Sequence, residues 1–367
     1  MSPRPPTLIF AGGGTGGHLF PGIAVADEIR RRRPDAAITF VGTKGKIEAR
    51  VVPARGYPFV TIWITGFPRR LSLETVLFPF RIVVALVQSL VLIRRRSPDA
   101  VVGTGGYVCG PVVYAAQILG IPTLVQEQNS MPGVTTRLLA PRATEVHITF
   151  ESSRRHLKRQ DNIHVSGNPT RGVLGTVSRS DAAGFFGLDP ARRTLLVFGG
   201  SLGATSINRA LLPAAPGFAA EGIQIVWQTG EQDFDLVRTT MDKEGDNVRV
   251  YRFIDSMEYA YAVCDLVVCR SGAGAVAELT RVGLASVLVP YPFAAADHQT
   301  ENAKVMAGAG AAMLVPDREA PALLPPAIRE LLRDPERRKS MADAARRLGK
   351  PLATSALAEA VLRVARR

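Results

Sequence analysis

The chain has 367 residues, of which 46% are hydrophobic and 21% charged, so it is long and apolar enough for two ordinary domains and is not a disordered protein. Its formal net charge is +13, and residues 1–170 carry 21 Lys and Arg against 10 Asp and Glu, whereas the remainder carries 24 against 22. This asymmetry predicts an anionic partner for the first half, either a nucleic acid or an anionic membrane surface.

The cysteines suggest neither a disulfide framework nor a metal site. Cys109, Cys264 and Cys269 are an odd number without metal-ligand spacing, and two of them lie in or beside apolar strands. We therefore expect buried thiols in a reducing compartment. The N-terminus runs directly into a predicted strand, so we expect no signal peptide.

A glycine-rich loop at residues 12–18 follows the first predicted strand, at residues 7–11, and precedes a helix with apolar periodicity. Strand, glycine turn and helix start form the layout of a phosphate-binding loop. Glycines allow the tight turn, and a helix N-terminus favours an anion. The loop also ends in His18, a titratable side chain beside the predicted anion site.

The same loop matches the dinucleotide spacing G-x-G-x-x-G, which requires an acid at the end of the second strand to hold a ribose. The second strand is predicted at residues 37–41, and no acid ends it. Asp35 precedes the strand and Glu48 lies beyond the loop that follows it. An NAD site is therefore disfavoured, and a phosphate or sugar site remains.

Residues 71–93 are the most apolar segment of the chain, with arginines on both sides. One acid, one proline and one arginine interrupt it, and its cleanest part, residues 82–93, is shorter than the roughly 20 apolar residues that span a bilayer. Three interpretations stay open: an interfacial helix, a buried helix on the sheet, or a helix with one face on each. We favour the last, and expect Leu86→Glu and Ile93→Glu to weaken binding to lipid vesicles.

Glycine and polar residues follow two further predicted strands of the first half. Residues 103–107 form a second glycine turn, and residues 126–129 are all polar. Open α/β sheets bind ligands at the carboxyl ends of their strands. We interpret Gln126 and Gln128 as cap or loop residues, and Asn129 as a ligand contact.

The second half repeats the plan after a linker at residues 167–171. A strand at residues 193–198 leads into a glycine loop at residues 199–204 and a helix. Another predicted strand, at residues 265–269, is followed by a loop at residues 270–275 and by a helix that carries Glu278. The Glu278 carboxylate could accept two hydrogen bonds from a ribose diol, or it could simply complement the helix dipole. Two such halves predict a cleft lined by both sets of loops.

Seven ordered motifs together resemble one family of bacterial peptidoglycan glycosyltransferases. Its members transfer N-acetylglucosamine from UDP-N-acetylglucosamine to undecaprenyl-pyrophosphoryl-N-acetylmuramoyl-pentapeptide. The motifs are GGGTGGHLFPGIAVA at 12–26, GTGGYVCGP at 103–111, EQNSMPG at 127–133, GNPTR at 167–171, GGSLGA at 199–204, RSGAGAVAE at 270–278 and DHQTENA at 297–303.

The resemblance implies an α/β fold with two Rossmann-like domains facing across a cleft, the glycosyltransferase type B arrangement. Residues 1–169 would form an acceptor and membrane-associated domain and residues 170–349 a UDP-sugar-binding domain. A C-terminal helix within residues 350–367 would pack back on the first domain.

The resemblance also implies roles for single residues. Those expected at the UDP-sugar are Thr15, Gly16, Gly17, Asn129, Arg171, Ser201, Ile254, Ala273, Glu278, Gln299 and Asn302. Those expected on the acceptor side are Gly14, Gly105, Gly106 and Tyr107. Ile254 would meet the uracil through its backbone, Glu278 would hold the ribose, and Ser201 would lie at the diphosphate. Gln126 departs from the family, where a histidine is common.

The implied reaction is an inverting displacement at the anomeric carbon by the 4-hydroxyl of the acceptor sugar. No Asp-x-Asp motif offers a metal site, so we expect no cofactor and no metal, with backbone N–H groups, Ser201 and Arg171 stabilising the leaving diphosphate. His18 is the candidate base because an imidazole titrates near neutrality. The alternative is that His18 only forms hydrogen bonds to the backbone or to the acceptor diphosphate.

The expected partners are UDP-N-acetylglucosamine, the undecaprenyl-linked muramoyl-pentapeptide, an anionic membrane surface and other cell-wall synthesis proteins. No cluster of base-stacking aromatics accompanies the charge, so no nucleic acid is expected. The expected location is the cytoplasmic face of the bacterial plasma membrane, with peripheral attachment. A UDP-N-acetylglucosamine 2-epimerase and a non-catalytic nucleotide-sugar-binding membrane adaptor are the alternative functions.

Overall fold

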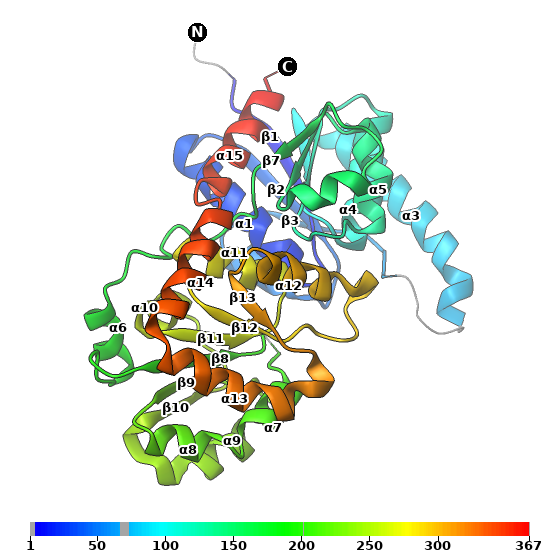
Figure 1. The fold of residues 1–367 in the computed structure, drawn as a ribbon. Helices are drawn as coiled ribbons and strands as arrows, with labels where there is room; N and C mark the ends of the chain where they lie inside the picture. Colours follow the sequence, from blue (N-terminus) through cyan, green and yellow to red (C-terminus); the bar gives the residue numbers. More distant parts are fainter. Residues whose placement is uncertain (1–3, 67–72, 201, 367) are drawn as a thin grey trace. The chain divides into compact units, whose positions relative to one another are not determined.

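The computed structural model describes residues 4–66, 73–200 and 202–366. The chain divides into two compact units, one formed by residues 1–170 and 351–367 and the other by residues 171–350 (Figure 1). Each unit contains one parallel sheet flanked by helices. The predicted fold class, two Rossmann-like α/β domains, is therefore confirmed.

The first unit is built on seven parallel strands in the order β3-β2-β1-β4-β5-β6-β7. These strands are β1 (Thr7–Ala11), β2 (Ala37–Gly42), β3 (Phe59–Thr61), β4 (Ala100–Gly103), β5 (Thr123–Glu127), β6 (Glu145–Ile148) and β7 (Ile163–Val165). The helices are α1 (Gly16–Arg32), α2 (Ile47–Ala54), α3 (Leu73–Arg96), α4 (Gly106–Ile118), α5 (Val134–Leu139) and α15 (Ala353–Val364), with 3₁₀ turns η1 (Ala140–Arg142) and η2 (Glu151–His156).

The sheet of the first unit is buried on both faces. In β1, Leu8 and Phe10 join a core that includes side chains of α1 and α15, whereas Ile9 and Ala11 join a core that includes side chains of α3 and α4. A strand covered on both sides must be apolar at successive positions, which explains the continuous apolar run before the first glycine loop. The helix α15, which comes from the far end of the sequence, packs beside α1 (Figure 1).

An ion pair ties α15 to the sheet. Arg363 donates to both carboxylate oxygens of Glu145, at 3.0 and 2.8 Å, and His147 Nε2 lies 3.1 Å from the same carboxylate. The His147 hydrogen bond and the Arg363 guanidinium lower the pKa of Glu145 to about 2, against an opposing effect of burial. Burial lowers the pKa of His147 and favours its neutral form, against the opposing hydrogen bond and charge of Glu145.

One side of α3 is buried in the first unit. Ala85, Ser89 and Ile93 follow each other at four-residue spacing and are buried, and Leu86 is half-buried against the same core. The expectation that substitutions at Leu86 and Ile93 report on lipid contact is therefore wrong, since Ile93 is only 1% exposed. A helix that is apolar all round gives no periodicity from which its buried face could be predicted.

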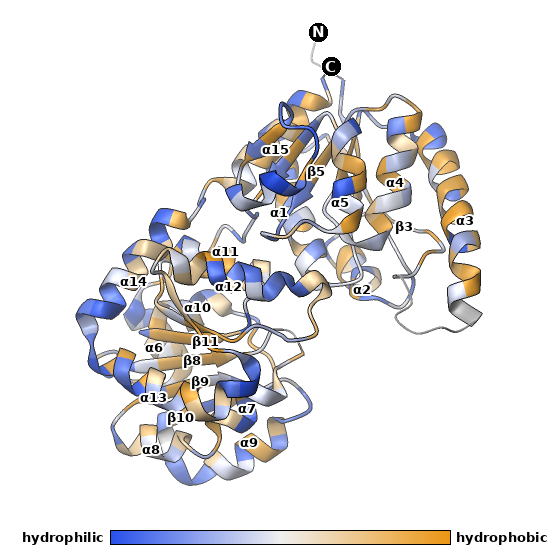
Figure 2. Ribbon diagram, turned by 45° about the vertical axis from the view of Figure 1, so that its right-hand side comes forward, coloured by the Kyte–Doolittle hydropathy of each residue, from blue (hydrophilic) through white to orange (hydrophobic). Residues whose placement is uncertain are grey.

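The opposite side of α3 forms an exposed apolar stripe, which we call the outer stripe. Its members are 43–75% exposed and follow helical spacing: Val76, Phe80, Val83, Val87 and Val91. Figure 2 shows the helix coloured as largely hydrophobic along its length. Trp63, itself 45% exposed, extends the stripe, with its ring 6.1 Å from that of Phe80 and 5.4 Å from the Arg81 guanidinium.

The length of α3 does not exclude a membrane span. Residues Thr75–Arg96, 22 in number, are long and apolar enough to cross a bilayer by length and composition alone. The uninterrupted part at residues 82–93 is shorter than a bilayer span, as expected, but the helix continues beyond it on the N-terminal side. The packing of α3 on the first unit, rather than its length, is the evidence that distinguishes a membrane-spanning helix from an interfacial one.

The second unit has six parallel strands in the order β10-β9-β8-β11-β12-β13. They are β8 (Thr194–Phe198), β9 (Gln224–Gln228), β10 (Val248–Tyr251), β11 (Leu266–Cys269), β12 (Ser286–Leu288) and β13 (Ala312–Leu314). The helices are α6 (Arg179–Phe186), α7 (Thr205–Leu211), α8 (Ala215–Ala220), α9 (Phe234–Met241), α10 (Met257–Val263), α11 (Ala273–Val282), α12 (His298–Gly308), α13 (Ala320–Arg333) and α14 (Pro335–Leu348), with 3₁₀ turns η3 (Asp242–Asn247), η4 (Ala295–Asp297) and η5 (Asp317–Glu319).

The three cysteines are free and buried, as predicted. Burial raises the pKa of all three thiols, that of Cys109 to about 12. The reactive thiolate form is therefore suppressed, and these side chains act as small apolar core residues.

Candidate active site

The glycine loops lie where the strand order of each sheet changes direction. In the first unit the chain runs from β1 outward to β2 and β3, then returns to β4 on the other side of β1. The loops after β1 and β4 therefore leave the sheet at its switch point, where open α/β sheets bind ligands. The predicted loop at residues 12–18 and the predicted turn at residues 103–107 follow these two strands.

A buried carboxylate supports the first glycine loop through a hydrogen bond to its backbone. Glu48 on α2 is fully buried, and its Oε2 accepts a hydrogen bond from Gly14 N at 3.1 Å. Its Oε1 accepts from Thr43 N at 3.2 Å and Thr43 Oγ1 at 2.8 Å. A Cβ on Gly13 would lie 2.6 Å from Oε1, so only glycine allows the loop to approach this carboxylate. Glu48 thus supports the loop, a role that the sequence did not indicate.

The N-terminus of α1 presents backbone donors at the same loop. Thr15 is the N-cap residue, and its side chain makes no capping hydrogen bond. The amides of Gly16 and Gly17 occupy the first helical turn, where N–H groups have no intrahelical acceptor. Thr15 and Gly17 are exposed and Gly16 is partly exposed. These amides form a suitable site for an anionic oxygen.

His18 packs against the second glycine turn. A Cβ on Gly105, whose φ is +96°, would lie 2.6 Å from His18 Nδ1. A Cβ on Gly106, with φ of +78°, would lie 2.5 Å from the carbonyl oxygen of Gly13 and 3.3 Å from the imidazole ring. Tyr107 similarly packs its ring on Gly14. The structure therefore brings together the four predicted acceptor-side residues and His18.

A chain of hydrogen bonds through three buried polar side chains begins at the imidazole of His18. His18 Nδ1 lies 3.1 Å from Gln128 Oε1, and Gln128 Nε2 donates to the carbonyl oxygen of Thr104 at 2.6 Å and to Gln126 Oε1. Gln126 Nε2 donates to Asn168 Oδ1 at 3.2 Å. Gln128 lies in the loop directly after β5, as interpreted, and its amide links strand ends to His18. Gln126 instead lies within β5, so its interpretation as a cap or loop residue is wrong.

Asn129 follows Gln128 and remains partly exposed. The buried Glu127 accepts hydrogen bonds from Asn129 N at 3.0 Å and Asn129 Nδ2 at 3.2 Å. Ser153 Oγ donates to the carbonyl oxygen of Asn129 at 2.9 Å. These contacts fix the orientation of the Asn129 amide beside the carboxyl end of β5.

In the second unit, one side chain connects the glycine loop at residues 199–204 with the segment before α10. Gln228 Nε2 donates to the carbonyl oxygen of Gly200 at 2.8 Å, and Gln228 Oε1 accepts from Ile254 N at 2.9 Å. Because the Ile254 amide is already paired, any backbone contact from this residue to a base would use its carbonyl group. Ser201, predicted at the diphosphate, lies outside the described residues.

The predicted ribose-binding acid, Glu278, lies on α11. Tyr261 donates its hydroxyl to Glu278 Oε2 at 2.8 Å. Burial raises the pKa of the Glu278 carboxyl, while the Tyr261 hydrogen bond and the charge of Arg171 oppose that effect. Arg171 in turn donates to the carbonyl oxygen of Asp255 at 3.1 Å and lies 3.9 Å from the Glu258 carboxylate. Additional donors to Glu278, such as a vicinal diol, would favour its ionised form.

The start of α12 is joined to the loop before α11. Ser271 Oγ donates to the carbonyl oxygen of Gln299 at 2.7 Å, and Asn302 Nδ2 donates to the carbonyl oxygen of Ser271 at 3.1 Å. Asn302 is fully buried, whereas Gln299 is partly exposed and accepts from Tyr291 N at 3.0 Å. Ala273, the first residue of α11, lies beside this junction. The geometry suits Gln299 for ligand contact and Asn302 for support.

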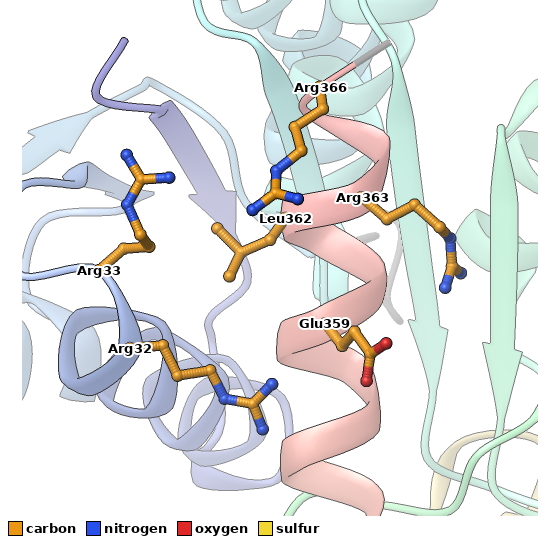
Figure 3. A pocket seen from close by; sticks show the side chains of 6 residues that line it. All are labelled: Arg32, Arg33, Glu359, Leu362, Arg363 and Arg366. Atoms are coloured by element: carbon orange, nitrogen blue, oxygen red, sulfur yellow. The ribbon is translucent and has the colours of Figure 1, made fainter. Parts of the chain in front are cut away.

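A separate pocket of about 560 Å³ in the first unit is lined by arginines rather than by the loops. Figure 3 shows it between α15 and the end of α1, with Arg32, Arg33, Glu359, Leu362, Arg363 and Arg366 as lining residues. Several of these arginines pair with acids, as Arg32 does with Glu28 at 2.7 Å and Arg33 with Asp35 at 2.7 Å. Because α1 and α15 both end here, the arginines complement two helix dipoles. Within residues 4–66, 73–200 and 202–366, no group of three or more metal-ligating side chains is found.

Comparison with known proteins gives a consistent result over the whole chain. Residues 8–148 match the glycosyltransferase family 28 N-terminal domain, and residues 194–359 match the glycosyltransferase family 28 C-terminal domain. The chain is 45% identical over 361 residues to the UDP-N-acetylglucosamine–N-acetylmuramyl-(pentapeptide) pyrophosphoryl-undecaprenol N-acetylglucosamine transferase of Chlorobaculum tepidum, covering 97% of this chain and 98% of that protein. Identity to the protein of the same name from Salinibacter ruber is 43%, covering 100% and 99%.

Solved structures agree with these relatives. The crystal structure of MurG from Acinetobacter baumannii has a TM-score of 0.77 and 30% sequence identity, covering 98% of this chain and 100% of that chain. A UDP-N-acetylglucosamine 2-epimerase structure has a TM-score of 0.64 at 14% identity, covering 99% and 98%. The similarity to the epimerase structure shows only that the two proteins share a fold.

Proposed function

Because this chain belongs to the family 28 glycosyltransferases named UDP-N-acetylglucosamine–N-acetylmuramyl-(pentapeptide) pyrophosphoryl-undecaprenol N-acetylglucosamine transferases, we propose that it converts the lipid-linked muramoyl-pentapeptide to its disaccharide form. It is a hexosyltransferase that uses UDP-N-acetylglucosamine. The acceptor 4-hydroxyl forms the new bond to the anomeric carbon, the bond to the diphosphate breaks, and UDP leaves with its electron pair. The anomeric configuration inverts.

We assign the general base to His18. The single observation that carries this assignment is the placement of its imidazole at the switch point of the first sheet, beside the α1 amides and held by Gln128. The base takes the proton of the acceptor hydroxyl as the glycosidic bond forms, and a positioned base typically contributes about 10²–10⁴-fold to a rate. Gly14, Gly105, Gly106 and Tyr107 form the acceptor-side wall around it.

We assign the binding of UDP-N-acetylglucosamine chiefly to the second unit. Glu278 would accept hydrogen bonds from the ribose diol, with Tyr261 orienting its carboxylate. The carbonyl group of Ile254 would meet the uracil, and Arg171 with the backbone of the glycine loop would stabilise the leaving diphosphate. The remaining assigned donor contacts are Thr15, Gly16, Gly17, Asn129, Ser201, Ala273 and Gln299, with Asn302 in support.

We further propose peripheral attachment to an anionic membrane through the outer stripe of α3. Exposed valines dip into the headgroup region while the exposed Arg94, Arg95 and Arg96 meet anionic lipid. The buried side of the same helix, Ala85 and Ile93, supports an interfacial position. A transmembrane α3 would have to leave the core of the first unit. The cytoplasmic leaflet, which carries the anionic lipid, is the assigned surface.

The test is transfer of labelled N-acetylglucosamine from its UDP donor to a synthetic lipid-linked muramoyl-pentapeptide, with and without chelator. We expect product in both conditions. His18→Ala should lower kcat at least about 10²-fold without changing UDP-N-acetylglucosamine affinity. His156→Ala, a histidine substitution on η2, is the matched control. Turnover retained in His18→Ala would exclude the base role, and absence of product from the unmodified chain would exclude the assigned reaction.

A further inference from the structure

The amide of Gln128 has only one orientation that its surroundings allow. Its Nε2 lies 2.6 Å from the carbonyl oxygen of Thr104, which can accept a hydrogen bond but cannot donate one. The group facing Thr104 must therefore be the NH₂ group. Its second proton is directed to Gln126 Oε1, whose own amide donates onward to Asn168 Oδ1 at 3.2 Å.

This orientation determines which nitrogen of His18 carries a proton. The Gln128 oxygen is left facing His18 Nδ1 at 3.1 Å, and an amide oxygen is an acceptor only. Nδ1 must then be the N–H nitrogen for a hydrogen bond to form. A neutral imidazole has one N–H, so Nε2 carries the lone pair.

The same residues also fix the position of the His18 backbone. Thr104 Oγ1 donates to the carbonyl oxygen of His18 at 2.7 Å, while the Thr104 carbonyl orients Gln128. Hydrogen bonds thus form a closed circuit from the His18 ring through Gln128 and Thr104 back to the His18 main chain. Gln128 is 2% exposed and Thr104 is 3% exposed, so water does not compete for these groups.

We propose that Gln128 is the positioning residue that sets the tautomer of His18, leaving Nε2 as the atom that receives the acceptor proton. This inference rests on the proposed base role of His18 for its functional consequence, but the tautomer itself does not depend on that role. Carboxylates that orient catalytic imidazoles elsewhere also leave a charge beside the ring. A neutral amide selects the tautomer while favouring the protonated imidazole less than a carboxylate would.

A spectroscopic experiment tests the tautomer without measuring activity. The full chain is labelled with ¹⁵N-histidine, and the His18 ring nitrogens are identified by comparison with His18→Gln. At a pH where the ring is neutral, we expect a protonated Nδ1 and an unprotonated Nε2. A protonated Nε2 in the unmodified chain would overturn the inference whatever the variants do.

Kinetics of Gln128→Met and Gln128→Glu test the consequence. The thioether has similar length but cannot accept from Nδ1 as the amide oxygen does, so kcat should fall about 10–100-fold while the KM for UDP-N-acetylglucosamine stays within about twofold. In Gln128→Glu, a protonated carboxyl can donate to the Thr104 carbonyl and present its other oxygen to Nδ1, so kcat should recover at least about fivefold relative to Gln128→Met. Gln117→Met, which removes a partly buried amide on α4, is the control for folding.

The outcomes separate this inference from the proposed function. If the ¹⁵N signals show the expected tautomer and Gln128→Met changes it without lowering kcat, the base role of His18 fails and the positioning inference stands. If Gln128→Met lowers kcat but leaves the tautomer unchanged, Gln128 is structural and the positioning inference fails. If Gln128→Met does not fold, the spectrum of the unmodified chain still decides the tautomer.

Discussion

Gly105→Ala is the substitution that most directly tests the packing of His18. The added Cβ would lie 2.6 Å from His18 Nδ1, 3.0 Å from the neighbouring ring carbon and 3.4 Å from Gln128 Oε1. Carbon and nitrogen atoms that are not bonded do not approach that closely, so the imidazole has to move by about 1 Å. A displacement of this size at a reacting group costs about 10²-fold in rate.

Backbone strain must be separated from this displacement. Gly105 has φ of +96° and ψ of −177°, a conformation that essentially only glycine adopts, and a non-glycine residue there costs about 1–3 kcal/mol. Gly120 has φ of +70°, and a Cβ added there would meet nothing within 4 Å, so Gly120→Ala carries strain without a clash. Both variants should have a lower midpoint of thermal unfolding than the unmodified chain, but only Gly105→Ala should have a lower kcat.

The assay compares kcat, the KM for each substrate and the unfolding midpoint of the two variants. We expect kcat of Gly105→Ala to fall about 10²-fold and that of Gly120→Ala to remain within about twofold. If Gly105→Ala is folded and keeps kcat within about threefold of the unmodified chain, the contact between the glycine turn and the imidazole does not matter for turnover. The assignment of His18 as a precisely held base would then be wrong.

Three further outcomes are expected. Glu48→Gln keeps one hydrogen-bond-accepting oxygen but turns an NH₂ group toward a backbone N–H of the first glycine loop, so the unfolding free energy should drop by about 1.5–3 kcal/mol. The KM for the acceptor substrate should rise more than the KM for the donor substrate. An unchanged unfolding free energy together with unchanged KM values would contradict the support role. Arg363→Met should lower the unfolding free energy by about 1–2 kcal/mol at pH 7, discounted for the half-exposed guanidinium. The pKa of Glu145 is about 2 in the folded chain against an ordinary value of 4.5, so its stabilising effect is complete above about pH 5 and is lost as the pH falls toward 2. The stability difference between Arg363→Met and the unmodified chain, measured by thermal unfolding, should therefore shrink from pH 5 to pH 3. A difference that stays constant would exclude the ion pair as its cause. Val83→Glu with Val87→Glu on the exposed side of α3 should abolish sedimentation with anionic vesicles while leaving the unfolding midpoint within about 2 °C, and unchanged sedimentation would exclude the outer stripe as the docking surface.

The parts of the site that the sequence predicted are local in the chain. The glycine loop at residues 12–18 and the turn at residues 103–107 are recognisable because each directly follows an apolar strand. Positive φ values at Gly14, Gly105 and Gly106 are requirements of the turns themselves. A pattern of strand, glycine and helix therefore carries enough information to place these backbone segments.

The parts that the sequence missed depend on contacts between distant segments. Glu48 reaches Gly14 over 34 positions, and Gln128 reaches His18 over 110 positions. Gln228 similarly joins Gly200 to Ile254 in the second unit. A buried acid or amide has no periodic signature, and its role is set by the donors that the fold places around it.

The outer stripe of α3 illustrates a different limit. Apolar residues occupy nearly every position of the helix, so hydropathy alone could not separate Ile93, which is buried, from Val87, which is 53% exposed. The partner helix α4 decides that difference. The uninterrupted apolar run also understates the length of the helix, because α3 continues through Arg81, whose guanidinium lies 5.4 Å from the Trp63 ring.

The packing of α15 on the first unit has a consequence for the order in which the molecule is made. As the chain leaves the ribosome, residues 171–350 emerge before α15 does, so the second unit can complete its fold first. Until α15 is made, the face of the sheet that carries Leu8 and Phe10 is covered by α1 and α2 without it. The first unit therefore cannot bury this face completely until α15 has been synthesised.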